Sequence, residues 1–266
     1  MTQQAPHTVN SLVRDLQALG LAEGDVVMVH SSMRSLGFVA GGAQAVVMAL
    51  LQVLGPAGTL VVPTHDPENS DPAGWCNPPV PESWWETIRR NRPGFDPATT
   101  PSRWMGVIAE CVRTWPGSRR SGHPQVSVAA VGREAATITS EHPLDDPHGE
   151  RSPLAKIWAA GGKVLLLGCG HSSNTSLHLA ETRQPQAPTT VTGAAVRSPD
   201  GGSRWASWEQ IVADESDFHT LGKAFEATGM VRRGRIGEAA ARLMDQRELV
   251  DFATGWLAAH RGPGQQ

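Results

Sequence analysis

Two residues with the chemistry of proton transfer stand close together near the middle of the chain. His178 and Glu181 follow an apolar run and two glycines in the stretch KVLLLGCGHSSNTSLHLAE, which runs from Lys163 to Glu181. Residues three apart are neighbours on a helix, so the Glu181 carboxylate can orient the imidazole or share a substrate amine with it. Imidazole is suited to proton transfer near neutral pH. We therefore predict general acid–base chemistry, with a hydrogen-bonded core histidine as the alternative.

A buried strand should position this pair. Val164 to Leu167 is wholly apolar, as in strands covered on both faces, and Gly168 and Gly170 allow a sharp turn after it. Ligands gather at the carboxyl ends of such strands. Cys169 lies in the same turn, and we interpret it as a small buried hydrophobe because nothing in the sequence shows a lowered thiol pKa.

Helices and strands alternate before this segment. The pattern predicts an amphipathic helix over 10–20, a strand over 25–30, a helix over 43–55 and a strand over 59–65. A strand–helix–strand unit of this kind should have parallel strands. The two strands end in His30 and His65.

The remaining segments complete an α/β pattern. We expect a helix over 102–112, a strand over 126–132, a helix at Pro153 capped by Ser152, a strand over 187–198 and a helical C-terminal part over 236–260. Residues 66–101 are rich in Pro, Asp, Asn and Trp and are expected to form a long irregular loop. Such a loop is either a binding wall or a flap whose tryptophans pack on the core. We predict one α/β domain over 1–266, with a central mixed sheet flanked by helices.

Composition narrows the class of protein. The 266 residues are 39% hydrophobic and 18% charged, with a formal net charge of -3 and no long basic block. Nucleic acid is therefore not expected as a partner. No signal peptide and no apolar run of membrane-spanning length is present, so we expect a cytoplasmic protein without a membrane partner. Three widely spaced cysteines indicate neither a disulfide framework nor a structural zinc site.

The loop after the first strand has free backbone donors. Ser31 and Ser32 are followed by Gly37, Gly41 and Gly42 before the next helix begins. A glycine-rich helix entry suits a pyrophosphate or the amide of a pantetheine arm, with a simple turn as the alternative. The spacing matches neither a nucleotide triphosphate loop nor a dinucleotide loop.

Several long blocks, in the same order along the chain, resemble the aminoglycoside N-acetyltransferases that act on the 3-amino group. The blocks are VHSSMRSLGFVAGGAQAVVMALLQVLGPAGTLVVPTH, FDPATTPSRWMGVIAE, RSGHPQVSVAAVG, DDPHGERSPLAKIW, VLLLGCGHSSNTSLHLAE and WEQIVADESDF. The resemblance implies transfer of acetyl from acetyl-CoA to an amine, and a fold distinct from the Gcn5-like acetyltransferase fold. It implies no metal.

The same resemblance implies roles for particular residues. The family pattern T-x-L-H-x-A-E falls on Thr175 to Glu181, which makes His178 the general base and Glu181 its partner. His30 is implied at the thioester end of the cofactor and Thr64 as an oxyanion donor. His171 is not implied as the base. The implied acetyl-CoA contacts are His30, Ser31, Ser32, Leu36, Gly37, Val39, Arg103, Met105, Ser121, His123 and Ser127.

An aminoglycoside carries several positive charges and should meet carboxylates. The candidate acids are Asp145, Asp146, Glu181, Asp214, Glu215 and Asp217, although a run of acids is often only a solvated face. Arg103, Arg119 and Arg120 are cations that can meet the CoA phosphates or remain solvated.

Three alternatives remain open from the sequence. One is acetylation of a different small amine at the same site. Another is a metal-dependent hydrolase built on His30, His65, His123, His142, His148 and His171, against which no known ligand spacing appears. The last is a non-catalytic binder of CoA or drug. A homo-oligomer is also left open.

Overall fold

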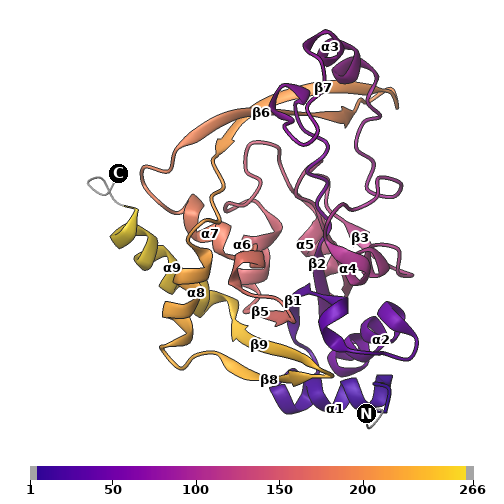
Figure 1. Cartoon of the computed structure of the whole chain (residues 1–266), viewed down its shortest axis with the longest axis vertical. Coiled ribbons are helices and arrows are strands. Elements are labelled where there is room, and N and C mark those ends of the chain that lie inside the picture. The colour runs from indigo at the N-terminus through magenta and orange to yellow at the C-terminus, as the bar shows by residue number, and fades with distance from the viewer. Residues whose placement is uncertain (1–4, 262–266) are drawn as a thin grey trace.

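A seven-stranded mixed sheet forms the centre of the computed structural model, which describes residues 5–261 (Figure 1). Its strand order is β3-β4-β2-β1-β5-β9-β8. The strands are β1 (Val26–Ser31), β2 (Thr59–Pro63), β3 (Arg119–Arg120), β4 (Val128–Gly132), β5 (Lys163–Leu167), β8 (Arg232–Ile236) and β9 (Ala239–Asp245). β1 pairs in parallel with β2 and with β5, and the outer pairs are antiparallel. Residues 1–4 and 262–266 of the predicted domain lie outside the described residues.

Alternate residues of the central strands face two different hydrophobic cores. Val27 and Val29 of β1 pack in one core, and Val26 and Met28 pack in the other. Successive strand side chains point to opposite faces, so both faces of β1 are buried under helices. The first core is covered by α1 (Val9–Leu19), α2 (Gly42–Leu54) and α4 (Gly106–Arg113). The second is covered by α5 (Ala135–Thr139), α6 (Pro153–Ala159), α7 (Leu177–Thr182), α8 (Phe218–Glu226) and α9 (Gln246–His260).

This architecture confirms the predicted fold class. The parallel strand–helix–strand unit of β1, α2 and β2 is present, and Ser152 accepts a hydrogen bond from Leu154 N at the start of α6. In the part of the chain that the structure describes, no helix has the length and hydropathy that a membrane crossing requires.

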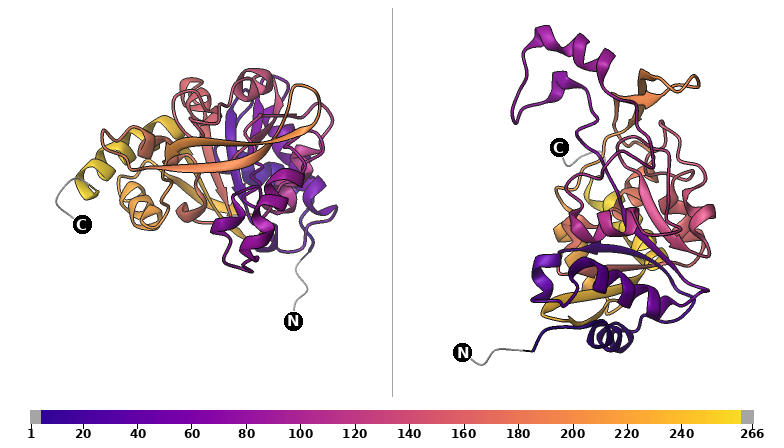
Figure 2. Two further views of the ribbon diagram at one scale, coloured as in Figure 1. Left: turned by 90° about the horizontal axis from the view of Figure 1, so that it is seen from above. Right: turned by 90° about the vertical axis from the view of Figure 1, so that its right-hand side faces the viewer.

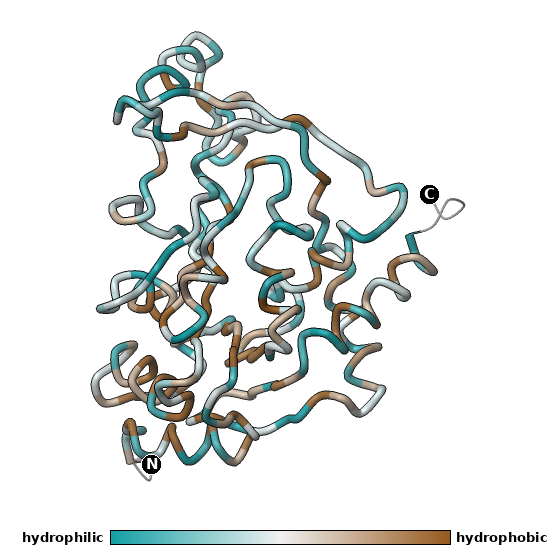
Figure 3. The backbone as a smooth tube through the Cα atoms, turned by 180° about the vertical axis from the view of Figure 1, so that it is seen from behind, coloured by the Kyte–Doolittle hydropathy of each residue, from teal (hydrophilic) through white to brown (hydrophobic). Residues whose placement is uncertain are grey.

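A polar arm extends from the body of the molecule. It consists of a two-stranded sheet, β6 (Thr189–Arg197) with β7 (Ser203–Ile211), and of α3 (Glu82–Asn91), which lies against β7. Figure 2 shows this arm projecting above the sheet, and Figure 3 shows that hydrophobic segments gather mainly in the body below it.

The structure corrects the prediction that residues 66–101 are wholly irregular. This segment contains the 3-10 turn η2 (Pro72–Gly74) and the ten-residue helix α3. Glu82 in its first turn and Arg89 and Arg90 in its last turn complement the helix dipole. No α3 residue is buried, and Trp84 is 57% exposed, so this helix packs on β7 and η2 outside the two main cores.

The prediction of continuous helix over 236–260 is also wrong in its first half. Residues 239–245 form β9, which pairs with β5 in the register Val164↔Met244, and α9 begins only at Gln246. The segment AAARLM is rich in helix-forming residues, but pairing with a buried strand overrides that local preference. Asp245 then caps α9 by accepting from Arg247 N and Glu248 N.

Candidate active site

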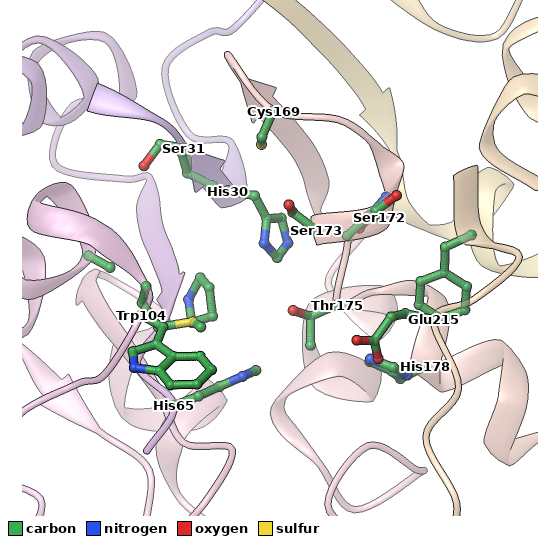
Figure 4. Close-up of a pocket in the computed structure, with 16 residues that line it drawn as sticks. His30, Ser31, His65, Trp104, Cys169, Ser172, Ser173, Thr175, His178 and Glu215 are labelled. Carbon is green, nitrogen blue, oxygen red and sulfur yellow. The ribbon is translucent and has the colours of Figure 1, made fainter. Parts of the chain in front are cut away.

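A cavity of about 380 Å³ opens where three parallel strands end (Figure 4). The carboxyl ends of β1, β2 and β5 lie side by side, and this edge of a parallel sheet is where ligands bind. Its lining residues are Val29, His30, Ser31, Pro63, His65, Trp104, Met105, Ala109, Cys169, Ser172, Ser173, Asn174, Thr175, His178, Glu215 and Phe218. The three elements predicted to end in chemically active residues therefore share one site.

The turn from β5 into α7 brings His178 to the wall of this cavity. Gly168 adopts φ 73, and a Cβ there would lie 2.6 Å from Ser35 Cβ, so only glycine fits this turn. The 3-10 turn η3 (His171–Ser173) follows, and α7 begins at Leu177. This compact path directs one side of α7 into the cavity.

His178 and Glu181 form the predicted pair. His178 Nδ1 lies 2.5 Å from Glu181 Oε2, and the Glu181 side chain is 4% exposed. A carboxylate accepts, so Nδ1 carries the proton of this hydrogen bond and Nε2 is the basic nitrogen. Nε2 has no hydrogen-bond partner among residues 5–261. The arrangement is that of an oriented imidazole ready to accept a proton from a bound ligand.

Two aromatic rings pack against the His178 imidazole. The His148 ring stacks on it at a centroid distance of 4.6 Å and an interplanar angle of 20°, and the Phe218 ring lies 4.9 Å away. His65 lies 6.4 Å from His148 and also lines the cavity. These contacts restrict rotation of the His178 ring.

The neighbouring histidines are neutral near neutral pH. Burial, with a smaller contribution from His178, lowers the pKa of both His30 and His65 to about 3. Burial likewise lowers the pKa of His123 to about 4 and that of His142 and His148 well below the ordinary value. In the described part of the chain, no group of three or more His, Cys, Asp or Glu side chains is arranged to hold a metal ion.

The predicted cofactor loop meets the cavity at its first residue. Ser31 lines the cavity, whereas Ser32 lies just behind it and donates its backbone N–H to Leu167 O. Leu36 and Val39 are buried in the core below α2. Gly37 adopts φ 75, and a Cβ there would lie 2.5 Å from Glu238 Cδ. Of the predicted loop residues, Ser31 therefore reaches the cavity, whereas Ser32, Leu36, Gly37 and Val39 contribute to the shape of the loop.

A second wall is formed by the segment that leads into α4. Met105 lines the cavity, and Arg103 donates its backbone N–H to His65 O while its exposed side chain lies 3.6 Å from Glu68. Trp104, which the sequence analysis did not single out, also lines the cavity and is 82% exposed. It is the one non-glycine residue with positive φ, 64°, among residues 5–261. A bulky residue in this conformation is strained, and strain of this kind clusters at ligand sites.

Thr64, Ser121, His123 and Ser127 lie behind the cavity. The Thr64 hydroxyl donates to Ser127 O at 3.1 Å and accepts from Arg120 Nε, so its role as an oxyanion donor stays a prediction that requires an exchange of partners. Ser127 Oγ donates to Thr64 O, and Ser121 Oγ bonds His142 Nδ1. His123 Nδ1 accepts from Gln125 N and Val126 N. The structure does not bring these four side chains to the cavity.

Of the predicted acidic residues, Glu215 alone lines the cavity as an exposed carboxylate. Asp145 and Asp146 pair with Arg151. Glu181 and Asp217 pair with Arg261, which also lies 3.8 Å from Asp214. Most of the predicted acids are therefore neutralised within the protein. Of the other predicted cations, Arg120 is bound inside the protein and Arg119 is exposed on β3.

Asn174 is a second residue that the sequence analysis missed. Its side chain lines the cavity and is 1% exposed. Asn174 Oδ1 accepts from Ser176 N, which leaves the Nδ2 donor buried with no partner in the described residues. The signal was present in the sequence as an amide three residues before the helix that carries His178 and Glu181, in the stretch SSNTSLH.

Cys169 and His171 differ in their access to the cavity. Cys169 lines it, and burial raises the pKa of its thiol to about 11, which disfavours the thiolate. His171 is not among its lining residues and hydrogen-bonds Glu226 at 3.1 Å. This geometry agrees with leaving His171 out of the catalytic residues.

Comparison with known proteins gives matches over nearly the whole chain. A family model described as aminoglycoside 3-N-acetyltransferase matches residues 28–258. The chain is 42% identical over 253 residues to the SPbeta prophage-derived aminoglycoside N(3')-acetyltransferase-like protein YokD of Bacillus subtilis (strain 168), covering 95% of this chain and 93% of YokD. It is 38% identical over 283 residues to aminoglycoside N(3)-acetyltransferase VII of Streptomyces paromomycinus, covering 97% and 96%.

Solved structures share the fold. The crystal structure of YokD from Bacillus subtilis superimposes with a TM-score of 0.95 at 40% identity, over 98% of this chain and 97% of YokD. A binary complex of AAC-IIIb with CoASH gives a TM-score of 0.85 at 35% identity, over 96% and 97%. AAC-VIa bound to sisomicin gives 0.86 at 31% identity, over 96% and 98%. The chain therefore belongs to the aminoglycoside 3-N-acetyltransferase family.

Proposed function

We propose that this protein transfers the acetyl group of acetyl-CoA directly to the 3-amino group of an aminoglycoside. The observation that carries the proposal is the His178–Glu181 pair on the wall of the cavity at the strand ends. Family membership supports the reaction, and relatives of the same fold bind CoASH in one case and sisomicin in another. A cytoplasmic location stays part of this proposal.

His178 acts as the general base. An alkylammonium, with a pKa of about 10, is not nucleophilic until it loses a proton. Once one proton has gone to solvent, His178 Nε2 takes the second as the amine nitrogen attacks the thioester carbonyl carbon. The C–S bond then breaks, and the departing sulfur takes the proton from His178 to give the CoA thiol and the N-acetyl product. Nδ1 keeps its hydrogen bond to Glu181 throughout.

Asn174 supplies a donor for the charge that develops on the carbonyl oxygen. Its Nδ2 is buried, lacks a partner among the described residues and belongs to a side chain that lines the cavity beside α7. A fixed donor of this kind costs no reorganisation when the oxyanion forms. We assign it this role in preference to Thr64, whose hydroxyl already has two partners.

The two substrates approach from different walls. We place the thioester end of acetyl-CoA against His30, Ser31 and Met105, with Arg103 near the CoA phosphates. The other predicted cofactor residues do not line the cavity and stay predicted contacts of the remainder of acetyl-CoA; they are Ser32, Leu36, Gly37, Val39, Ser121, His123 and Ser127. The amine enters beside His178 and Glu215.

A specific observation favours a second acceptor class. Glu215 is the one acid that lines the cavity in the described residues, and it has no ion-pair partner there, whereas Asp214, Asp217 and Glu181 face Arg261. A polycation gains less from such a wall than from several free carboxylates. A smaller amine with one or two charges is therefore the alternative acceptor.

The test is release of CoA thiol from acetyl-CoA by the purified protein, with a panel of aminoglycosides and simple amines and mass spectrometry of the products. We expect one added acetyl group on the 3-amino position, and raised drug tolerance in bacteria that express the protein. Acetylation of simple amines alone would select the second acceptor class. Binding of both ligands without thiol release would refute catalysis.

A further inference from the structure

The Glu181 carboxylate has a second side-chain partner besides His178, and this partner is a cation. Its Oε1 lies 2.5 Å from Arg261 Nη1, while its Oε2 lies 2.5 Å from His178 Nδ1. Asp214 N also donates to Oε1 at 3.1 Å. Both carboxylate oxygens are therefore engaged, each by a different element of the fold.

Arg261 uses its remaining donors on the loop before α8. Its Nε and Nη2 bind the Asp217 carboxylate at 2.7 and 2.5 Å, and Nη2 also donates to Asp214 O at 2.6 Å. Arg261 directly follows the last residue of α9, so one guanidinium ties the C-terminal helix to α7 and to the loop that carries Glu215. Such a paired, fork-like arrangement fixes direction as well as distance.

We infer that Arg261 is a positioning residue for acetyl transfer, which holds Glu181 so that His178 presents Nε2 to the cavity and which anchors the loop bearing Glu215. This inference rests on the proposed function. It adds the end of α9 to the active site, although Arg261 itself does not line the cavity.

The physical reason lies in the burial of Glu181. A buried carboxylate is costly unless its oxygens are paired. With Oε1 held by Arg261 and Asp214 N, Oε2 is left to accept from His178 Nδ1–H, and this selects the tautomer with a free lone pair on Nε2. Without Arg261, Glu181 can rotate and the imidazole loses its fixed orientation.

Arg261 also balances the charge around the base. The charged groups that face His178 are Glu181 on its own helix and Asp214 and Glu215 on the loop before α8. His30, His65 and His148, on the other elements packed around it, are neutral because burial lowers their pKa. Removing Arg261 leaves more unbalanced negative charge around the base. The acidic limb of the kcat/KM profile should then move to higher pH.

The experiment compares Arg261→Gln with Arg183→Gln. The Arg183 side chain also ties the end of α7 to α9, through Asp251 at 3.6 Å, and it binds Glu150 at 2.7 Å. It makes no hydrogen bond or ion pair with the Glu181 carboxylate within the described residues. We expect Arg261→Gln to lower kcat about 10- to 100-fold and to move the acidic limb to higher pH, with the KM for acetyl-CoA unchanged. Arg183→Gln should change neither, and Arg261→Lys should return the limb towards its original position.

Asp217→Asn provides an opposite test and remains informative if Arg261→Gln folds poorly. It removes a negative charge but keeps the Arg261–Glu181 pair, so the acidic limb should move to lower pH. The inference is overturned if Arg261→Gln matches Arg183→Gln, or if Asp217→Asn does not move the limb to lower pH.

A readout without substrate separates this inference from the proposed function. Nitrogen NMR of labelled histidines, with His178→Gln to assign the signal, reports which ring nitrogen carries the proton. We expect the Nδ1–H form in the unchanged protein and a mixture in Arg261→Gln. An identical spectrum in Arg261→Gln would overturn the positioning role, whatever the acceptor proves to be.

Discussion

Two histidine–glutamate pairs have their histidines in the segment that follows β5, His171 in η3 and His178 in α7, and they differ in access to the cavity. His178 Nδ1 meets Glu181 at 2.5 Å, and His171 Nε2 meets Glu226 at 3.1 Å. Both glutamates also bind arginine, Glu181 through Arg261 and Glu226 through Arg242 and Arg233. Only the His178 pair borders the cavity.

The interior pair, His171–Glu226, shows that a neighbouring carboxylate alone does not make a histidine available as a base. Burial lowers the pKa of His171 even though Glu226 acts to raise it, and the remaining ring nitrogen, Nδ1, is buried without a partner in the described residues. Gly222 of α8 packs directly on the imidazole. A base therefore needs the partner and also a free nitrogen that a ligand can reach.

Replacing each histidine should break the comparison most strongly. We expect His178→Ala to lower kcat about 10²- to 10⁴-fold, because general-base assistance is lost. Acetyl-CoA affinity should stay near its original value in calorimetry. His171→Asn is the matched variant, and turnover per folded molecule should change little. Equal losses of kcat in the two variants would show that access to the cavity does not separate the roles of the two pairs.

Replacing Asn174 should give the next largest effect on kcat. Both His171 Nδ1 and Asn174 Nδ2 are buried without partners in the described residues, but only Asn174 lines the cavity. Asn174→Asp keeps the Oδ1 that accepts from Ser176 N and removes the donor. We expect kcat to fall about 10²- to 10³-fold, as for loss of one oxyanion donor. A fall confined to KM, measured by steady-state kinetics, would contradict the oxyanion role.

The sequence predicted which residues meet at this cavity where they are close in sequence or stand at strand ends. The apolar runs of β1, β2 and β5 place His30, His65 and Cys169 at one sheet edge, and the spacing of three places Glu181 beside His178. Arg261 could not be found in this way, because it is 80 residues from Glu181 and reaches it only through the docking of α9. The prediction of helix over 236–245 failed for a related reason, since pairing with β5 decides the conformation of β9.

Other parts of the site depend on backbone conformation that composition does not report. Nothing in the residue type of Trp104 predicts φ 64, since tryptophan disfavours that region. Conversely, Thr64 and Ser127 have the chemistry of ligand-binding residues, but their hydroxyls bond within the interior. The sequence predicts a ligand-binding role for Thr64 and Ser127 from their residue type, but it does not report which partners their hydroxyls find in the folded chain.

Burial of histidines also predicts how the free energy of unfolding responds to acid. His30 and His65 have pKa values lowered to about 3 by burial, and His123 to about 4. Between pH 6.5 and 4 the unfolded chain binds more protons than the folded one, so stability falls as pH falls. Each such histidine should cost on the order of 1–2 kcal/mol between pH 7 and pH 5. Urea unfolding at the two pH values measures this loss. His123→Gln should reduce the change of unfolding free energy with pH. An unfolding free energy that does not depend on pH over this range would contradict the burial argument.

The smallest expected effect is a change in unfolding free energy when the packing around the His171–Glu226 pair is altered. A Cβ added at Gly222 would lie 2.0 Å from His171 Cγ, whereas Gly255 in α9 has nothing within 4 Å. We expect Gly222→Ala to cost about 1–3 kcal/mol of unfolding free energy through overpacking. Gly255→Ala should instead add about 0.5–1 kcal/mol, since alanine favours helix. Thermal unfolding measures both. Because we assign His178 and not His171 to the reaction, Gly222→Ala should keep its turnover per folded molecule. A large loss of kcat at full folding would give the His171–Glu226 pair a part in the reaction.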